Sequence, residues 1–159
     1  MWGSHIIQAW ASVYANSSTI RTLLGFAHVA GLIVGGGSAI AADRGVLRAV
    51  RLARSELSLH LAAIRSAHSI VLASLAVVMA SGVLLAASDT ETFLHAPLFW
   101  LKMALVGLLI VNGAFMRRLT ERAAAGTRPR WKPLAFTAGA SLTLWLLTTL
   151  AGAALPNVH

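Results

Sequence analysis

The chain has 159 residues, of which 57% are hydrophobic and 11% are charged, and its mean hydropathy is +0.74. This composition is typical of a small integral membrane protein with a single domain, residues 1–159, and excludes an ordinary water-soluble globule. No cysteine is present, which excludes disulfides, thiolate-bound metals and iron–sulfur clusters held by this chain. The net charge of +8 does not indicate nucleic acid as a partner, because the basic residues lie between apolar runs, where membrane topology explains them.

The first segment, residues 1–19, does not resemble a cleavable signal peptide, since it lacks a charged start and a long apolar core. Trp2, Trp10 and Tyr14 fall on one side of a helix drawn through it. We therefore predict a short N-terminal helix that lies in the membrane interface, with Trp and Tyr at headgroup depth. Residues 16–19 then offer a turn and an N-cap for the next helix.

Four apolar runs follow, each close to the ~20 residues that a helix needs to cross the ~30 Å hydrocarbon layer. The predicted spans are residues 22–42, 64–87, 97–116 and 134–155. Because short connections join them, we predict an all-α membrane protein, an antiparallel four-transmembrane-helix bundle preceded by the interfacial helix. No acid lies within these ranges, so a carboxylate-based proton or cation pathway is not expected.

Basic residues predict the orientation of the bundle. The first and third connections, with their edges, carry 11 of the 13 Lys and Arg. The second connection, residues 88–96, contains Asp89 and Glu91 and no Lys or Arg. The positive-inside rule then places the first and third connections in the cytoplasm. We predict a multi-pass protein of the bacterial inner (cytoplasmic) membrane with both termini outward, and the lipid bilayer as its main partner.

His28 is the one ionisable residue in the first span, about 9 Å below its outer end. A polar ring in hydrocarbon is costly unless it has a partner. Gly25, Gly31, Gly35 and Ser38 share its helical face, which lets a second helix approach closely. The segment therefore predicts an inner helix of the bundle, with the imidazole at its contact with a neighbouring helix. That imidazole either binds a cofactor or bonds a hydroxyl or carbonyl of a neighbouring helix.

Two further candidates lie near the outer end of the third span. His95 is at its lip, and Lys102 is about 8 Å deeper. A neutral imidazole is a common ligand for haem iron, copper or zinc. Lys102 could pair with a haem propionate, accept a proton, or act as a ligand when deprotonated. The alternatives are a solvated loop histidine and a lysine that extends to the outer headgroups.

On the inner side, Arg65 and His68 lie three residues apart on one face of the second span. Both are candidates for cofactor binding, and His68 joins His28 and His95 as a candidate metal ligand. A single axial pair of His28 and His68 is not favoured, because their depths differ by about 15 Å. One outer site with His28 and His95, or separate outer and inner sites, both remain open. Alternatively, His68 bonds backbone or phosphate, and Arg65 pairs with lipid phosphate.

Three motifs resemble a known group of proteins. They are FAHVAGLIVGGG around His28, Arg65 at the start of span two, and FWLKMALVGLLIVN around Lys102. Over Leu23–Arg118 the chain resembles the superfamily that includes the copper-resistance D proteins and the haem-binding protoporphyrinogen oxidase of the HemJ type. The resemblance implies a helical bundle that binds haem b or copper, with His28 and Lys102 in the site. The oxidase activity is not inferred, because residues 35–37 are glycines where an aromatic residue usually occurs.

From these observations we predict a membrane haem b-binding protein that acts in electron transfer or membrane redox chemistry. The reason is an intramembrane histidine without a carboxylate or thiol beside it. Copper handling is one alternative, although only Met79 and Met103 lie near useful depths. A structural accessory subunit of a larger membrane complex is the other, and other membrane subunits or a redox partner are possible partners. No phosphate-binding loop, HExxH motif or nucleophile elbow indicates a specific enzyme.

Overall fold

The computed structural model describes residues 2–49, 57–124 and 131–155. This part of the chain is almost entirely helical. The helices are α1 (Trp2–Asn16), α2 (Ser18–Ala49), α3 (Leu57–Ser88), α4 (Thr90–His95), α5 (Pro97–Ala124) and α6 (Trp131–Ala154).

Four of the helices contain a stretch long and apolar enough to cross a membrane. These stretches are Ser18–Arg48, Ala67–Ser88, Pro97–Arg122 and Lys132–Ala154. The prediction of an all-α chain with four candidate spans is therefore confirmed, and the spans overlap the ranges expected from hydropathy.

Local sequence explains where several helices begin. The break between α1 and α2 falls at Ser17, whose hydroxyl accepts a hydrogen bond from the backbone N–H of Ile20 at 3.3 Å. Helix α5 begins at Pro97, which needs no hydrogen-bond partner for its nitrogen in the first turn. The 88–96 connection, expected as a loop, contains the short helix α4, because the Asp89 carboxylate caps it by accepting from the N–H of Thr92 at 3.2 Å.

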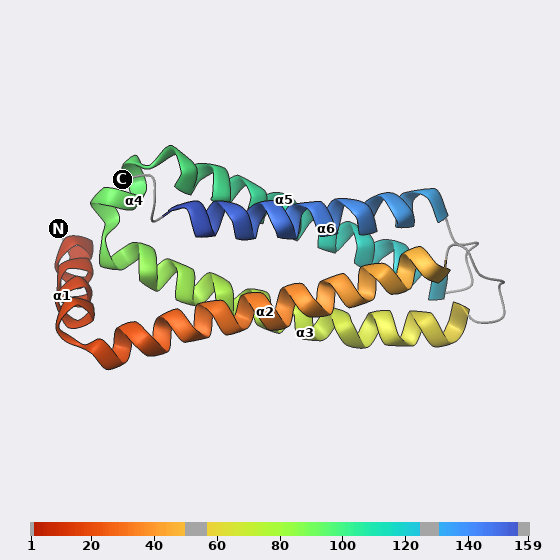
Figure 1. The fold of residues 1–159 in the computed structure, drawn as a ribbon, viewed down its shortest axis with the longest axis horizontal. Coiled ribbons are helices and arrows are strands. Elements are labelled where there is room, and N and C mark those ends of the chain that lie inside the picture. The colour runs from red at the N-terminus through yellow and green to blue at the C-terminus, as the bar shows by residue number, and fades with distance from the viewer. Residues whose placement is uncertain (1, 50–56, 125–130, 156–159) are drawn as a thin grey trace.

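The long helices form two neighbouring pairs, α2 with α3 and α5 with α6 (Figure 1). The pairs are joined mainly where α6 packs on α2, whereas α3 and α5 touch little. Helices α1 and α4 lie at the same end of the molecule, at the left of Figure 1. The indole Nε1 of Trp10 donates to the carbonyl of Leu84 at 2.8 Å, which ties α1 to α3. The position of α1 in a membrane interface stays a prediction.

The small-residue face of α2 is where the other helices come closest. A Cβ on Gly31 would lie 2.8 Å from the Val78 side chain, and one on Gly35 would lie 2.8 Å from Cβ of Ser74. The Trp145 ring of α6 lies 3.3 Å from the same position on Gly35. The predicted close approach is therefore confirmed at these two glycines. It does not extend to Gly25, where a Cβ would meet nothing within 4 Å.

One sequence-based expectation is wrong. The first span was expected to end at Ala42, with Asp43 in the following connection. Instead α2 continues to Ala49, and Asp43 is a buried residue, 5% exposed, within a candidate spanning stretch. The expectation that no acid lies within a span fails with it. The physical reason is that Gly35, Ala39 and Asp43 follow one another at steps of four, so the packed face of α2 carries the carboxylate into the bundle.

Candidate functional sites

His28 on α2 is bonded to a hydroxyl on the neighbouring helix. Its Nδ1 lies 2.9 Å from Oγ of Ser81 on α3. The Ser81 hydroxyl donates to the carbonyl of Val77 at 2.6 Å, with the carbonyl of Val78 at 3.1 Å. Because the single proton of the Ser81 hydroxyl is directed at a backbone carbonyl, we infer that the Nδ1–H of His28 is the donor in the interhelical bond. In a neutral imidazole this leaves the lone pair on Nε2. The backbone of Val78 is a further hydrogen-bond partner of the His28 side chain.

The sequence left two roles open for His28, a hydrogen bond to a neighbouring helix or binding of a cofactor. The bond to Ser81 is the first of these, and it does not exclude the second. Histidines that bind a metal through one nitrogen usually donate the other N–H to an oxygen acceptor, which fixes the tautomer and the ring orientation. Ser81 provides such an acceptor for His28. The absence of a side chain at Gly82 makes room for the ring, because a Cβ there would lie 3.3 Å from Cε1 of His28.

Lys102 on α5 belongs to the same end of the bundle. Its ammonium is close enough to the His28 imidazole for the two to interact electrostatically. Its Nζ lies 3.3 Å from where a Cβ of Gly152 would be, in the last turn of α6. The carbonyls at a helix C-terminus carry partial negative charge, so this turn is a favourable place for an ammonium. The buried hydroxyl of Thr148, one turn earlier on α6, has no hydrogen-bond partner. The structure therefore places Lys102 at the same end of the bundle as His28, and a shared cofactor site stays a prediction.

The other predicted outer residue, His95, lies at the end of α4 and is exposed. Its Nδ1 donates to the carbonyl of Glu91 at 2.7 Å, within the same helix. This bond satisfies one ring nitrogen without any residue from the spanning helices. The structure thus gives His95 a local contact in α4, whereas His28 is bonded between α2 and α3.

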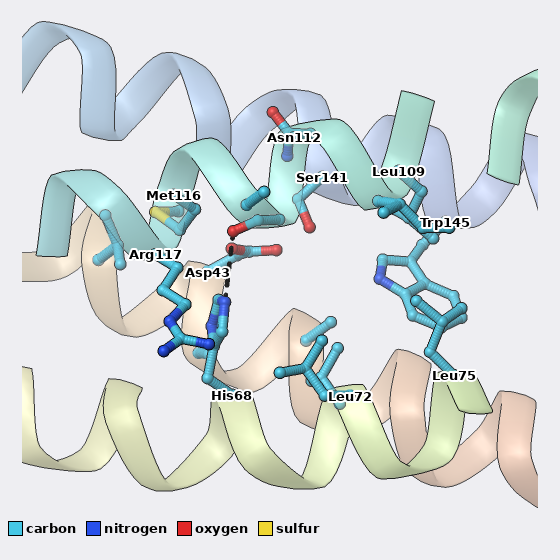
Figure 2. Close-up of a pocket in the computed structure, with 17 residues that line it drawn as sticks. Asp43, His68, Leu72, Leu75, Leu109, Asn112, Met116, Arg117, Ser141 and Trp145 are labelled. Atoms are coloured by element: carbon cyan, nitrogen blue, oxygen red, sulfur yellow. Dashed lines mark hydrogen bonds between the residues drawn. The ribbon is translucent and has the colours of Figure 1, made fainter. Parts of the chain in front are cut away.

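The predicted inner residues are separate from the outer site. His68 on α3 donates from Nε2 to the carbonyl of Gly113 on α5 at 3.3 Å, the dashed line in Figure 2. Ser81, which is level with His28, is about 20 Å from His68 along α3 at a rise of ~1.5 Å per residue. The two histidines are therefore too far apart to be axial ligands of one haem. Arg65 belongs to α3, but its side chain lies outside the described residues.

Within the described ranges 2–49, 57–124 and 131–155, no group of three or more His, Cys, Asp or Glu residues gathers to hold a metal ion. Such a group is needed for zinc, which takes three or four protein ligands. Haem iron differs, because the porphyrin supplies four nitrogens and the protein adds only axial ligands. A haem would therefore need only one or two axial ligands from the chain, and His28 and His68 stay candidates for that role.

The structure also shows a site that the sequence interpretation missed. A cavity of about 190 Å³ lies between α2, α3, α5 and α6 (Figure 2). Its walls are mostly apolar. The polar side chains that line it are those of Asp43, His68, Asn112, Arg117 and Ser141.

Asp43 is the least satisfied of these groups. Its carboxylate interacts with the hydroxyl of Ser141 on α6, but Oδ2 is buried and has no hydrogen-bond partner. Arg117 at the same end of the cavity is paired with Glu121, one turn along α5, at 2.7 Å. The amide of Asn112 on α5 donates to the Thr137 carbonyl on α6 at 3.0 Å. A hydrogen bond between helices is the role expected of an amide side chain within a span. The sequence did contain one signal for this missed site: Gly35, Ala39 and Asp43 are spaced four residues apart, which places Asp43 on the packed face of α2.

Four candidate spanning helices indicate a multi-pass helical membrane protein, with an imidazole and an ammonium at one level and a buried carboxylate at another. Comparison of the chain with models of known protein families, with curated proteins and with solved structures gives no match. The resemblance described above therefore depends on its three sequence motifs alone.

Proposed function

We propose that this chain is a haem b-binding protein of the bacterial inner membrane that acts in electron transfer or membrane redox chemistry, with His28 as an axial ligand. The observation that supports this function best is the bond from Nδ1 of His28 to Ser81, which leaves the lone pair on Nε2 in a neutral ring. An intramembrane ionisable residue with a fixed orientation is a functional candidate by default. Haem would supply the one-electron chemistry at this site.

The residues around His28 fit an axial role in two respects. The ring is held by α3 through Ser81 and Gly82, so its direction is set by backbone packing. Lys102 places a positive charge nearby, suited to a haem propionate. The space beside Gly31 is filled by α3 residues, so the residues that would hold a haem here are His28, through its ring nitrogen, and Lys102, through a propionate.

We further propose that this end of the bundle faces outward. The supporting observation is the charge distribution. The C-terminal parts of α2 and α5, which contain Arg44, Arg48 and Arg122, lie at the opposite end from α4, which contains Glu91 and is capped by Asp89 (Figure 1). By the positive-inside rule, the arginine-bearing ends face the cytoplasm. His28 and Lys102 then lie in the outer leaflet, accessible to an electron partner on that side.

The test is an absorption spectrum of protein purified from haem-replete cells, oxidised and reduced. The expected result is a Soret band that His28→Ala weakens strongly. His95→Ala serves as the matched control, because that histidine is exposed and bonded within its own helix. Equal helix content in both variants, measured by circular dichroism, shows that folding is unchanged. A colourless, iron-free preparation of the unaltered protein contradicts the proposal, and copper without a porphyrin spectrum supports copper handling instead.

An accessory-subunit function has one observation in its favour. Gly37 on α2 and Gly107 on α5 are exposed, and a Cβ on either would meet nothing within 4 Å. Small residues on an exposed face let a helix of another subunit approach closely. Stoichiometric purification with a larger complex in mild detergent, lost in Gly107→Leu, would support this function. A stable protein that carries its cofactor alone would count against it.

A further inference from the structure

We propose that the inner cavity is a binding site for a small organic ammonium, a ligand with one positive charge and a compact apolar body. This inference does not depend on haem binding. It follows from the charge, the shape and the walls of the cavity around Asp43.

The charge comes from Asp43. Asp43 is 5% exposed, and its carboxylate oxygen Oδ2 has no hydrogen-bond partner. A buried carboxylate is costly unless a cation or several donors satisfy it. Among the described residues that line the cavity, the other charged one is Arg117, whose guanidinium is paired with Glu121. His68, the nearest ring, uses its Nε2–H on the Gly113 carbonyl. An ammonium N–H from a ligand would supply the donor that Oδ2 lacks.

The shape sets the size of the ligand. The cavity has a volume of about 190 Å³. An apolar cavity of about 150 Å³ in another protein binds benzene. The space therefore suits a body of about one ring with a short aminomethyl arm. Figure 2 shows Asp43 at one end of the cavity and Trp145 with Leu75 at the other. The ammonium would lie at the carboxylate, and the ring would pack between the leucine and indole side chains.

The walls argue against a bare metal ion. Calcium takes about six to eight oxygen ligands, and the lining offers few. The carboxylate of Asp43 and the hydroxyl of Ser141 are the acidic and hydroxyl oxygens among the lining side chains. Across the described helices no group of three metal-ligating residues occurs. A cation that brings its own apolar surface matches these walls better than one that must replace a full hydration shell.

The test uses 4-fluorobenzylamine, titrated into the full chain in phosphatidylcholine nanodiscs and followed by ¹⁹F NMR, with empty nanodiscs as the blank. We expect saturable binding. Asp43→Asn keeps the shape and removes the charge, so it should weaken binding about tenfold or more, since hydrogen bonds to charged groups are the strong ones. The neutral analogue 4-fluorobenzyl alcohol should bind the unaltered protein and Asp43→Asn equally.

A second pair of variants tests the cavity without touching the carboxylate. Gly113 lines the cavity, and a Cβ there would meet nothing within 4 Å, so Gly113→Leu should fill the space and weaken both ligands. Gly107→Leu is the control, on the same helix with equally open space but outside the lining. If Asp43→Asn does not fold, the comparison of Gly113→Leu with Gly107→Leu tests whether the amine binds in the cavity. The proposal is overturned if the amine does not bind saturably, if a folded Asp43→Asn binds it as well as the unaltered protein, or if Gly113→Leu has no effect. Those results would mean that only water or a lipid chain fills the cavity.

Discussion

The imidazole of His28 on α2 donates from Nδ1 to the hydroxyl of Ser81 on α3 at 2.9 Å. That hydroxyl is itself oriented by the carbonyl of Val77, one turn earlier on α3. The backbone of one helix therefore determines which nitrogen of a histidine on another helix carries the proton. The role of Nδ1, which bonds Ser81, can therefore be tested separately from that of Nε2, which is the candidate ligand atom.

The first prediction concerns Ser81. Replacing it with alanine removes the acceptor for Nδ1–H and releases the ring orientation, without changing His28. We expect Ser81→Ala to lower haem affinity by about 10- to 100-fold, as loss of an outer-shell partner typically does at metal sites. Haem titration followed by the Soret band measures this. Ser88→Ala, whose hydroxyl bonds only the Leu85 carbonyl among the contacts described, should leave affinity unchanged. Equal affinity in both variants would show that Ser81 has no orienting role.

The second prediction compares two glycines of α2. Gly35→Ala would place a methyl 2.8 Å from Cβ of Ser74, whose position is fixed by the α3 backbone. We expect it to destabilise the fold by about 1–3 kcal/mol, the usual cost of overpacking. Gly37→Ala meets nothing within 4 Å and should be neutral or stabilising by up to ~1 kcal/mol, because alanine favours the helix. Thermal unfolding in detergent should show a lowered melting temperature for Gly35→Ala and an unchanged or raised one for Gly37→Ala, and a similar fall in both variants would contradict the packing described.

The third prediction concerns the bond between α5 and α6. The side chain of Asn112 donates to the backbone carbonyl of Thr137 at 3.0 Å, and Thr137 is almost fully buried. Asn112→Leu keeps the volume and removes the donor, so it should cost about 0.5–1.5 kcal/mol of stability. Val111→Leu, at a neighbouring exposed position, should change stability little. Urea or heat denaturation of both variants measures the difference, and a stabilised Asn112→Leu protein would show that the bond contributes nothing.

The fourth prediction concerns orientation. Because the chain has no cysteine, a single introduced thiol reports its own location. Glu91→Cys and Arg48→Cys are suitable, because both native residues are exposed and their segments, α4 and the last turn of α2, lie at opposite ends of the bundle. A membrane-impermeant maleimide should label Glu91→Cys in intact cells, whereas it should label Arg48→Cys only after permeabilisation. The reverse pattern would place the basic ends outside and move His28 to the inner leaflet.

Hydropathy and helix punctuation were enough to predict the helical class and the four candidate spans. The start of α5 at Pro97 and the break before α2 at Ser17 follow from local chemistry that tertiary contacts do not override. The close approach at Gly31 and Gly35 was predictable for the same reason, because residue spacing alone places them on one face.

The inner cavity was not predicted, because a charged residue ends an apolar run on any hydropathy scale, whatever packs against it. Asp43 is buried by α6, about 100 residues away in sequence, where Ser141 meets its carboxylate. Likewise, the sequence could identify His28 as a residue that needs a partner, but it could not choose Ser81 among the hydroxyls of three other helices. Both answers depend on which helices are neighbours, and apolar periodicity does not specify this.

The two helix pairs meet mainly between α2 and α6, where Trp145 lies against Gly35 and Gly36 and Val46 packs in a second buried cluster with Leu134 and Ala138, whereas α3 and α5 touch little. The chain is thus built as two helical hairpins joined mainly through α2 and α6. Each hairpin can satisfy its own backbone hydrogen bonds during insertion, before the other has entered the bilayer. We expect the two hairpins to associate after insertion, with the packing of the indole on the glycine pair as one of the contacts that join them. Substitutions there should leave membrane insertion intact and produce unassembled hairpins, which quality-control proteases would remove.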